Sequence, residues 1–269
     1  MADLFGFEKS LVYHDVLLFY YFLPNEGRDT LFLLHPAFAD HEIFEAQIDF
    51  FRSKYQILLL DFPGHGKSAA KGTKATTGDI PDIMKRILDE NNIAECHVLG
   101  VSLGSLIAQG FADRFADMTK SVIIVGGYSI HKANKNVARA QGKEIFKFAF
   151  YILFSMKKFR NYVTEQTPGS EHFREVFRRG ADKFKRSSFP AMSKMNSLFV
   201  KKDAPMTYPF LILCGDYDHQ LAQDAARGLH ALEPGSKYAR IPDAGHCANI
   251  DNPDIFNTVL DDFLSGLDL

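Results

Sequence analysis

The chain has 269 residues, 46% hydrophobic and 24% charged, a composition that excludes a disordered chain and allows a large buried core. No stretch reaches the roughly 18 to 20 uncharged apolar residues that a membrane span needs, and the first residues lack the basic and apolar regions of a signal peptide. We therefore expect a soluble, cytoplasmic protein with no stable membrane insertion.

The formal net charge of −2 hides an uneven distribution. Residues 129–205 contain 17 Lys and Arg against 6 Asp and Glu, whereas the rest of the chain contains 14 against 27. Such a basic segment can indicate an anionic partner or substrate, but a solvated helical surface is the interpretation that we favour. Because no nucleic-acid-binding motif accompanies the basic residues, we expect no nucleic-acid partner.

The predicted elements begin with an antiparallel hairpin in residues 10–24. Nearly continuous apolar runs follow, and they favour strands of a parallel sheet that is buried on both faces. These runs are residues 30–35, 56–61, 97–102, 121–126 and 209–215.

Between the apolar runs lie three segments whose apolar residues recur at intervals of three and four, which predicts helices at 41–55, 79–92 and 105–116. A closing helix is predicted at 253–267, with Pro253 in its first turn. The strand-helix alternation predicts an α/β fold with a mostly parallel central sheet flanked by helices.

The alternation stops in residues 129–205, which are helical in pattern, Phe-rich and basic. We expect these residues to be an insertion in a core formed by residues 1–128 and 206–269. The apolar run at 146–159 has three interpretations: the wall of an acyl or aromatic pocket, a helix that binds a partner or a membrane surface, and plain core of the insertion.

The cysteines give no sign of a disulfide or metal site. Cys96, Cys214 and Cys247 are an odd number without metal-type spacing, so we expect reduced, buried thiols.

The strongest signal for chemistry is Gly100-Val101-Ser102-Leu103-Gly104, a G-x-S-x-G pattern between a predicted strand and a predicted helix. A sharp turn there would strain the backbone of Ser102 and require neighbours without side chains. Because a serine hydroxyl is a poor nucleophile at neutral pH, it needs a base, and the base needs an orienting acid.

Candidates for both partners lie later in the chain, in loops after predicted strands. His246 follows the strand-like run 238–241 and is the candidate base. Asp216 and Asp218 follow the run 209–215, and either could orient the imidazole.

Outside residues 129–205 the chain resembles the α/β-hydrolase superfamily, which has the same order of serine, acid and histidine. The resemblance implies that the acid is Asp218, three residues after Gly215. It implies that 129–205 is a helical cap, and that His65, in the segment Asp61-Phe-Pro-Gly-His-Gly-Lys-Ser, is structural.

The resemblance also implies an oxyanion hole made of backbone N–H groups. One donor is Leu103, after the nucleophile. In the segment His35-Pro36-Ala37-Phe38, Pro36 stands where the family usually has Gly and has no N–H, so the other donor would be Ala37, with Phe38 as the alternative. His35 is interpreted as structural.

These residues predict a serine hydrolase that cleaves a small carboxylic ester, anionic or acyl in character, through an acyl-enzyme. Thioester, lactone and carbon–carbon bond hydrolysis remain open, and a non-catalytic ligand-binding or regulatory protein is the alternative of another class. The chemistry needs no metal and no organic cofactor. The sequence does not set the oligomeric state.

Overall fold

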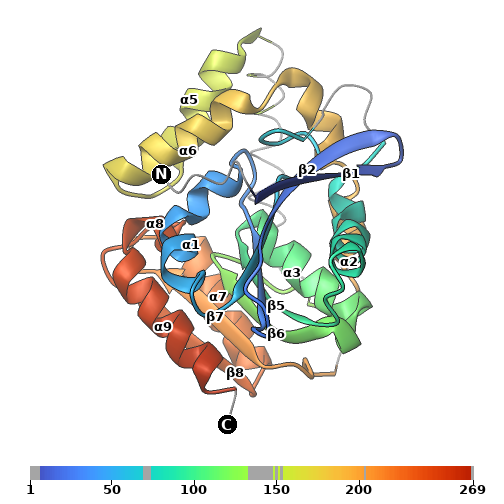
Figure 1. Ribbon diagram of the computed structural model, residues 1–269. Coiled ribbons are helices and arrows are strands. Elements are labelled where there is room, and N and C mark those ends of the chain that lie inside the picture. Colours follow the sequence, from blue (N-terminus) through green and yellow to red (C-terminus); the bar gives the residue numbers. More distant parts are fainter. Residues whose placement is uncertain are drawn as a thin grey trace.

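The computed structural model describes residues 7–68, 74–132, 148, 151, 154–202 and 204–267. In these residues, eight strands form one sheet in the order β1-β2-β4-β3-β5-β6-β7-β8 (Figure 1). The strands are β1 (Glu8–Tyr13), β2 (Val16–Leu23), β3 (Thr30–Leu34), β4 (Gln56–Leu60), β5 (Cys96–Val101), β6 (Thr119–Val125), β7 (Phe210–Gly215) and β8 (Ser236–Ile241).

Strands β3 to β8 pair in parallel, whereas β1 and β2 form an antiparallel hairpin whose second strand pairs antiparallel to β4. The predicted edge hairpin and the mostly parallel sheet are therefore confirmed. The sequence pattern indicated a strand only at 238–241, and β8 begins two residues before this run.

Helices cover both faces of the sheet, which explains why its central strands are apolar throughout. Leu33, Leu59 and Leu99 face one core, together with α1 and α9, and their neighbours Phe32 and Leu58 face the other, against α2 and α3. The helices and short 3₁₀ turns of the core are η2 (His41–Phe44), α1 (Glu45–Phe51), η3 (Thr77–Asp79), α2 (Ile80–Glu90), α3 (Leu103–Arg114), η4 (Ala116–Met118), α7 (Gln220–Leu232), α8 (Ala248–Asp251) and α9 (Pro253–Ser265).

The helix predicted at 41–55 is shorter than expected. The Asp40 carboxylate accepts the N–H of Glu42 at 3.1 Å and starts a 3₁₀ turn, and the α-helix runs only from Glu45 to Phe51. Helix α7 was not predicted, because its buried face consists mainly of the small residues Ala225 and Ala226 with Leu229.

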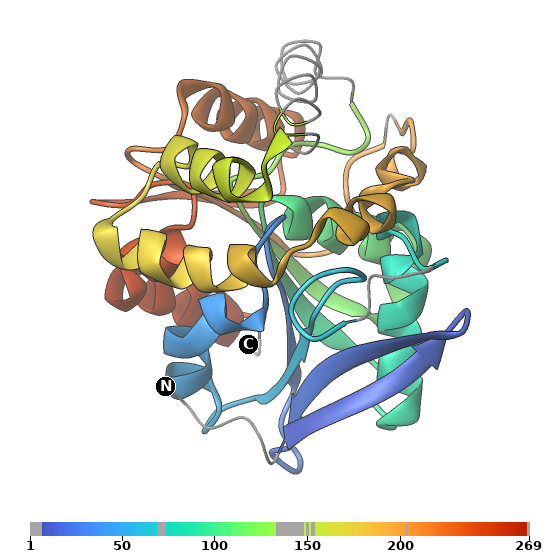
Figure 2. The same cartoon turned by 90° about the horizontal axis from the view of Figure 1, so that it is seen from above.

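The described part of the connection between β6 and β7 consists of helices and 3₁₀ turns joined by irregular segments, and it has no strand. It contains α5 (Met156–Gln166), α6 (Glu171–Lys183), η5 (Arg186–Met192) and η6 (Met195–Leu198). Helices α5 and α6 lie over one end of the sheet (Figures 1 and 2). Their buried residues Phe159, Phe173 and Phe177 belong to the same apolar cluster as the sheet.

Two predictions about this connection remain open. The division into a core and a cap at residues 129–205 stays a prediction. Six residues of the run 146–159 lie outside the described residues, so the three interpretations of this run stay open. Within the described ranges, no helix combines the length and apolar character needed to cross a membrane.

Leu99→Ala tests the central core. Leu99 is fully buried in β5, so its truncation is expected to lower the free energy of unfolding by about 2–5 kcal/mol. Urea unfolding followed by circular dichroism measures the change. Leu232→Ala is the control, because Leu232 is 47% exposed and its truncation is expected to change stability by less than about 1 kcal/mol. Equal losses in the two variants would contradict this assignment of the core.

Candidate active site

The loops that carry the predicted site residues meet at one edge of the sheet. Ser102 follows β5, Asp218 follows β7 and His246 follows β8. Ala37 lies in the loop after β3, which we call the oxyanion loop (residues 35–40). All these strands run in parallel, so their carboxyl ends share an edge, the usual place for a ligand site in such sheets.

Ser102 occupies a strained turn between β5 and α3. Its φ of 52° and ψ of −110° are unusual for a residue with a side chain. A Cβ on Gly100 would lie 2.1 Å from the carbonyl oxygen of Gly104, and one on Gly104 would lie 2.2 Å from that of Leu34. Both glycines are therefore required by close backbone approaches, as the sequence pattern predicts.

Asp218 and His246 are in direct contact. The Nδ1 atom of His246 lies 2.9 Å from Oδ1 and 3.0 Å from Oδ2 of Asp218, whose side chain is only 1% exposed. The Asp218 loop is held by Gln223 of α7, whose amide donates to the Asp218 carbonyl at 2.7 Å. Asp216 instead pairs with Arg240 at 2.8 Å, so of the two candidate acids only Asp218 contacts the histidine.

The contact with Asp218 determines the protonation of His246. Burial opposes a charge on the imidazole, but the carboxylate charge and the hydrogen bond outweigh it, and the pKa of His246 is raised above its ordinary value. With Nδ1 facing Asp218, Nε2 is the nitrogen left for a proton transfer.

Val125, the last residue of β6, and Gly126, which follows it, connect Ser102 with His246. The N–H of Ser102 donates to the carbonyl of Val125 at 2.8 Å. A Cβ on the next residue, Gly126, would lie 2.9 Å from Cε1 of His246. Among the described residues, no hydrogen bond joins the Ser102 hydroxyl to the imidazole.

The oxyanion loop presents free backbone donors. The carbonyl of Pro36 accepts the N–H of Ala39 at 3.4 Å, and Phe38 has a φ of 68°. Within the described part of the chain, the N–H groups of Ala37 and Leu103 have no acceptor, the latter because it opens α3.

His35 and His65 have structural contacts. Nδ1 of His35 donates to the Pro36 carbonyl at 2.7 Å and Nε2 accepts the Phe62 N–H at 3.1 Å, so both nitrogens are used. Burial lowers the pKa of His35 to about 4 and that of His65 to about 3, which keeps both imidazoles neutral.

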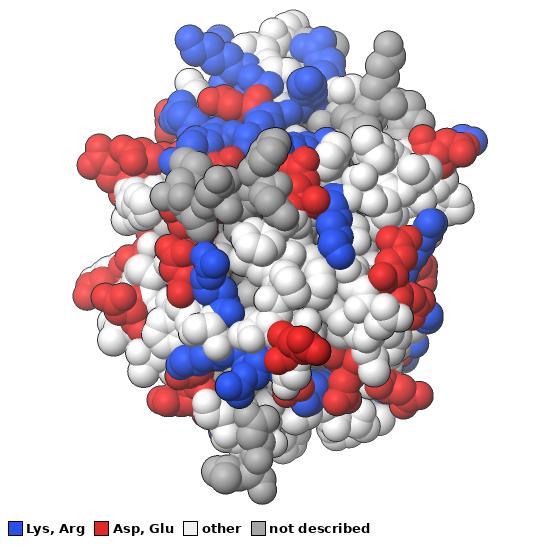
Figure 3. Space-filling view, in the orientation of Figure 1, with Lys and Arg blue, Asp and Glu red and all other residues white. Residues whose placement is uncertain are grey.

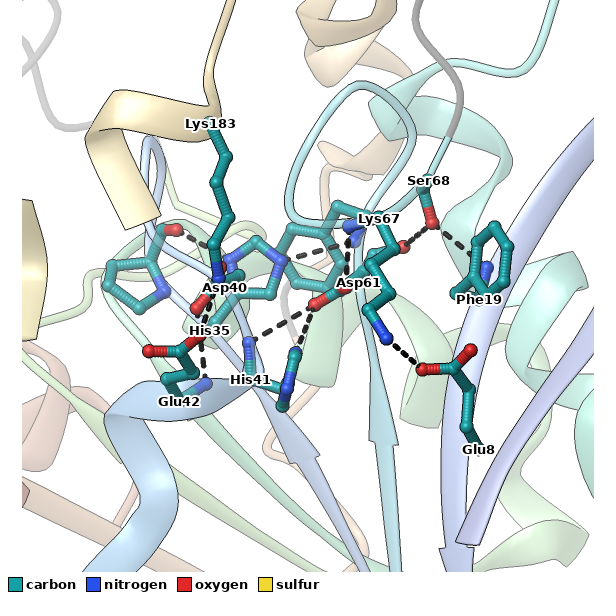
Figure 4. Close-up of polar contacts among 12 residues, drawn as sticks. Glu8, Phe19, His35, Asp40, His41, Glu42, Asp61, Lys67, Ser68 and Lys183 are labelled. Carbon is teal, nitrogen blue, oxygen red and sulfur yellow. Dashed lines mark hydrogen bonds and ion pairs between the residues drawn. The ribbon is translucent and has the colours of Figure 1, made fainter. Parts of the chain in front are cut away.

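A buried ion pair between His41 and Asp61 lies beside the oxyanion loop and was not predicted from the sequence (Figure 4). Asp61, at the end of β4, accepts hydrogen bonds from Nδ1 of His41 at 2.8 Å and from the Lys67 N–H at 2.9 Å. Burial opposes the charge of each partner, but their attraction outweighs it, lowering the pKa of Asp61 and raising that of His41. The pair fastens η2 to the end of β4.

The three cysteines are buried and unpaired, as expected. Cys247 adjoins His246, but burial and then the carboxylates of Asp251 and Asp218 raise the pKa of its thiol. Burial also raises the pKa of Cys214 to about 12. These thiols are therefore poor nucleophiles, and the serine is the better candidate.

Comparison with known proteins shows which hydrolases this chain resembles. A model of the alpha/beta hydrolase fold matches residues 29–144. A 2-hydroxy-6-oxononadienedioate/2-hydroxy-6-oxononatrienedioate hydrolase of Klebsiella pneumoniae is 26% identical over 256 residues, 90% of this chain and 88% of its own. A pimeloyl-[acyl-carrier protein] methyl ester esterase of Aeromonas hydrophila is 24% identical over 250 residues, 89% of this chain and 96% of its own.

A third relative matches a smaller part of the chain. An (E)-2-((N-methylformamido)methylene)succinate hydrolase of Acinetobacter baylyi is 32% identical over 108 residues, and this match spans 40% of the chain and 41% of that relative. Among solved structures, a hydrolase from Pseudomonas aeruginosa PA01 superposes with a TM-score of 0.81 at 21% identity, over 96% of this chain and 98% of its own.

Asp218→Asn tests the contact with His246. Because the carboxylate charge raises the pKa of His246 and burial lowers it, removing the charge is expected to move that pKa below its wild-type value. An NMR titration of labelled histidine measures it. Asp216→Asn is the matched control and is expected to leave the pKa unchanged, because Asp216 pairs with Arg240. An equal fall in both variants would show that Asp218 has no special role.

Proposed function

Because the chain belongs to the α/β-hydrolase superfamily, we propose that it is a serine hydrolase that cleaves a small carboxylic ester through an acyl-enzyme. The observation that supports this best is the direct contact of buried Asp218 with His246, beside a strained turn that carries Ser102. A nucleophile, a base and an orienting acid are then available from three neighbouring loops.

In the proposed reaction, Ser102 Oγ attacks the ester carbonyl while Nε2 of His246 takes its proton. The negative charge of Asp218 stabilises the imidazolium that forms. The tetrahedral intermediate collapses, the alkoxide leaves with the proton from His246, and the acyl group stays on Ser102. A water molecule then attacks the acyl-enzyme with His246 again as base, and the acid is released.

The oxyanion of each tetrahedral intermediate would be held by the N–H groups of Ala37 and Leu103. Both groups lack an acceptor within the described part of the chain, so both can donate to a ligand. Removing one such donor from a hydrolase typically raises the barrier by about 3–4 kcal/mol. Pro36 contributes no donor, which leaves the N–H of Ala37 as the first available in this loop.

The β6–β7 connection would act as the cap over this site. Phe38 of the oxyanion loop packs edge to face against Phe148, Phe159 and Phe184 of the connection, with ring centroids 5.1–5.8 Å apart. An aromatic wall of this kind suits an apolar acyl or alcohol group and excludes water from the intermediate.

The charge of the connection favours an anionic substrate. Lys and Arg side chains gather over α5 and α6 (Figure 3), where Lys157, Lys158, Arg174 and Arg178 are exposed. A positive surface on this connection would attract a negatively charged ester.

Carbon–carbon bond hydrolysis is the second candidate. It is favoured by the similarity, over 90% of this chain, to a hydrolase of 2-hydroxy-6-oxononadienedioate. A substrate panel of simple esters, thioesters, lactones and a vinylogous 1,5-diketone separates these activities, because each leaves a different product.

A fluorophosphonate probe tests the serine. We expect one adduct on the wild-type protein by intact mass, none on Ser102→Ala and strongly slowed labelling of His246→Ala. Ester turnover is expected to fall about 10⁴- to 10⁶-fold in both variants. Ser187→Ala and His172→Ala are controls on the exposed surface and are expected to label like the wild type. A folded wild-type protein that neither labels nor hydrolyses any ester would favour a non-catalytic ligand-binding protein.

Esters of matched size, with and without a carboxylate, test the substrate charge. We expect a higher kcat/KM for the anionic ester. Lys157→Gln or Lys158→Gln is expected to reduce the kcat/KM of the anionic ester about 2- to 5-fold and to leave that of the neutral ester unchanged. Lys237→Gln, exposed on β8, is the control. Equal kcat/KM values for the two esters in every variant would rule out recognition of the charge.

A further inference from the structure

We propose that α6 is a brace that fixes the distance between the His246 loop and the oxyanion loop, with Asp251 and Lys183 as its positioning residues. This inference rests on the proposed function, because the two loops would supply the base and an oxyanion donor. The helix is fastened at both ends to these loops, by backbone and charged contacts that its sequence pattern does not reveal.

The N-terminal end of α6 is tied to the loop of His246. The N–H of His246 itself donates to the carbonyl of Pro168, just before the helix, at 2.9 Å. One Asp251 oxygen accepts the N–H of Ser170, the N-cap of α6, at 2.7 Å, and the other accepts the N–H of Gly245 at 2.8 Å. Asp251 therefore links the helix to the residue that precedes the base.

The backbones at this end are in close contact. A Cβ on Gly245 would lie 2.2 Å from the Pro168 carbonyl oxygen, so no other residue type could bring the two loops so close. Any shift of the N-terminal end of α6 would consequently be transmitted to His246.

The C-terminal end of α6 is tied to the oxyanion loop (Figure 4). The Lys183 ammonium lies 2.7 Å from the Asp40 carboxylate, which is 1% exposed, and also pairs with Glu42. Arg179 adds a contact of 3.1 Å to Glu42. One turn earlier, a Cβ on Gly180 would lie 2.9 Å from the Cα of Ala39, so the helix rests directly on the loop backbone.

The body of α6 is stiff enough to connect the two ends. It has 13 residues, hence a length of roughly 20 Å, and Phe173, Val176 and Phe177 bury its inner face. Catalytic groups must be held within about 0.5 Å of their productive positions, so the relative placement of base and oxyanion donor depends on both ties.

The test compares Asp251→Asn and Lys183→Met with the controls Asp254→Asn and Lys185→Met, which change exposed neighbours. With a neutral ester, kcat is expected to fall roughly 10- to 100-fold in each brace variant with little change in KM, because the geometry of the transition state is disturbed. The controls are expected to match the wild type. Lys183→Arg, which keeps the charge, is expected to retain most of kcat.

The combination Asp251→Asn/Lys183→Met tests whether the two ties act as a unit. A brace fastened at two ends fails when either end is released, so the double variant is expected to be little worse than the poorer single variant. If the fold-loss in kcat of the double variant equals the product of the two single losses, the contacts at the two ends act independently, and this result would overturn the proposal.

A second variant and an NMR measurement separate a loss of folding from a loss of positioning. If Lys183→Met unfolds because Asp40 is left buried and unpaired, Asp40→Asn/Lys183→Met removes both charges while Asn keeps the cap of η2. The pKa of His246 in Asp251→Asn, measured by NMR, is expected to fall towards its ordinary value as the contact with Asp218 loosens. An unchanged kcat and an unchanged pKa in folded variants would overturn the brace, whereas a wild-type protein without labelling or turnover would overturn the hydrolase itself.

Discussion

The close approach of Gly104 to the carbonyl of Leu34 determines how α3 meets the sheet. This contact, possible only without a side chain, sets the first turn of the helix against the end of β3. Leu103, whose N–H has no acceptor among the described residues, precedes Gly104 directly, and Ser102 lies one residue before it in a strained backbone. The candidate nucleophile and both candidate oxyanion donors thus lie next to one backbone contact between α3 and β3.

Much of the fold could be predicted from the sequence, because parallel strands buried on both faces leave continuous apolar runs such as 121–126. The edge hairpin and the crossover helices followed from similar local patterns. Helix α7 could not be found in this way, since Ala225 and Ala226 give a weak periodic signal. The helix after Asp40 was predicted too long, because a side-chain cap, which the apolar pattern does not register, shapes its start.

Part of the candidate site was also predictable, since Ser102, Asp218 and His246 each follow a recognisable strand. The choice of Asp218 over Asp216 required the family resemblance. The structure adds a physical reason, because Asp216 forms an ion pair with Arg240. Three contacts could not be predicted from the sequence: His41–Asp61, Lys183–Asp40 and Ser170–Asp251. Their members lie on different elements, and no local pattern connects residues that meet only after the chain has folded.

The burial of the cysteines has a chemical consequence for the candidate site. Cys247 adjoins His246 and the Cys214 sulfur lies 4.0 Å from Asp218, yet both thiols are buried and stay protonated at neutral pH. Oxidation of a cysteine proceeds through the exposed thiolate, a form that neither residue populates. Burial therefore disfavours oxidation of both thiols beside the contact of Asp218 with His246.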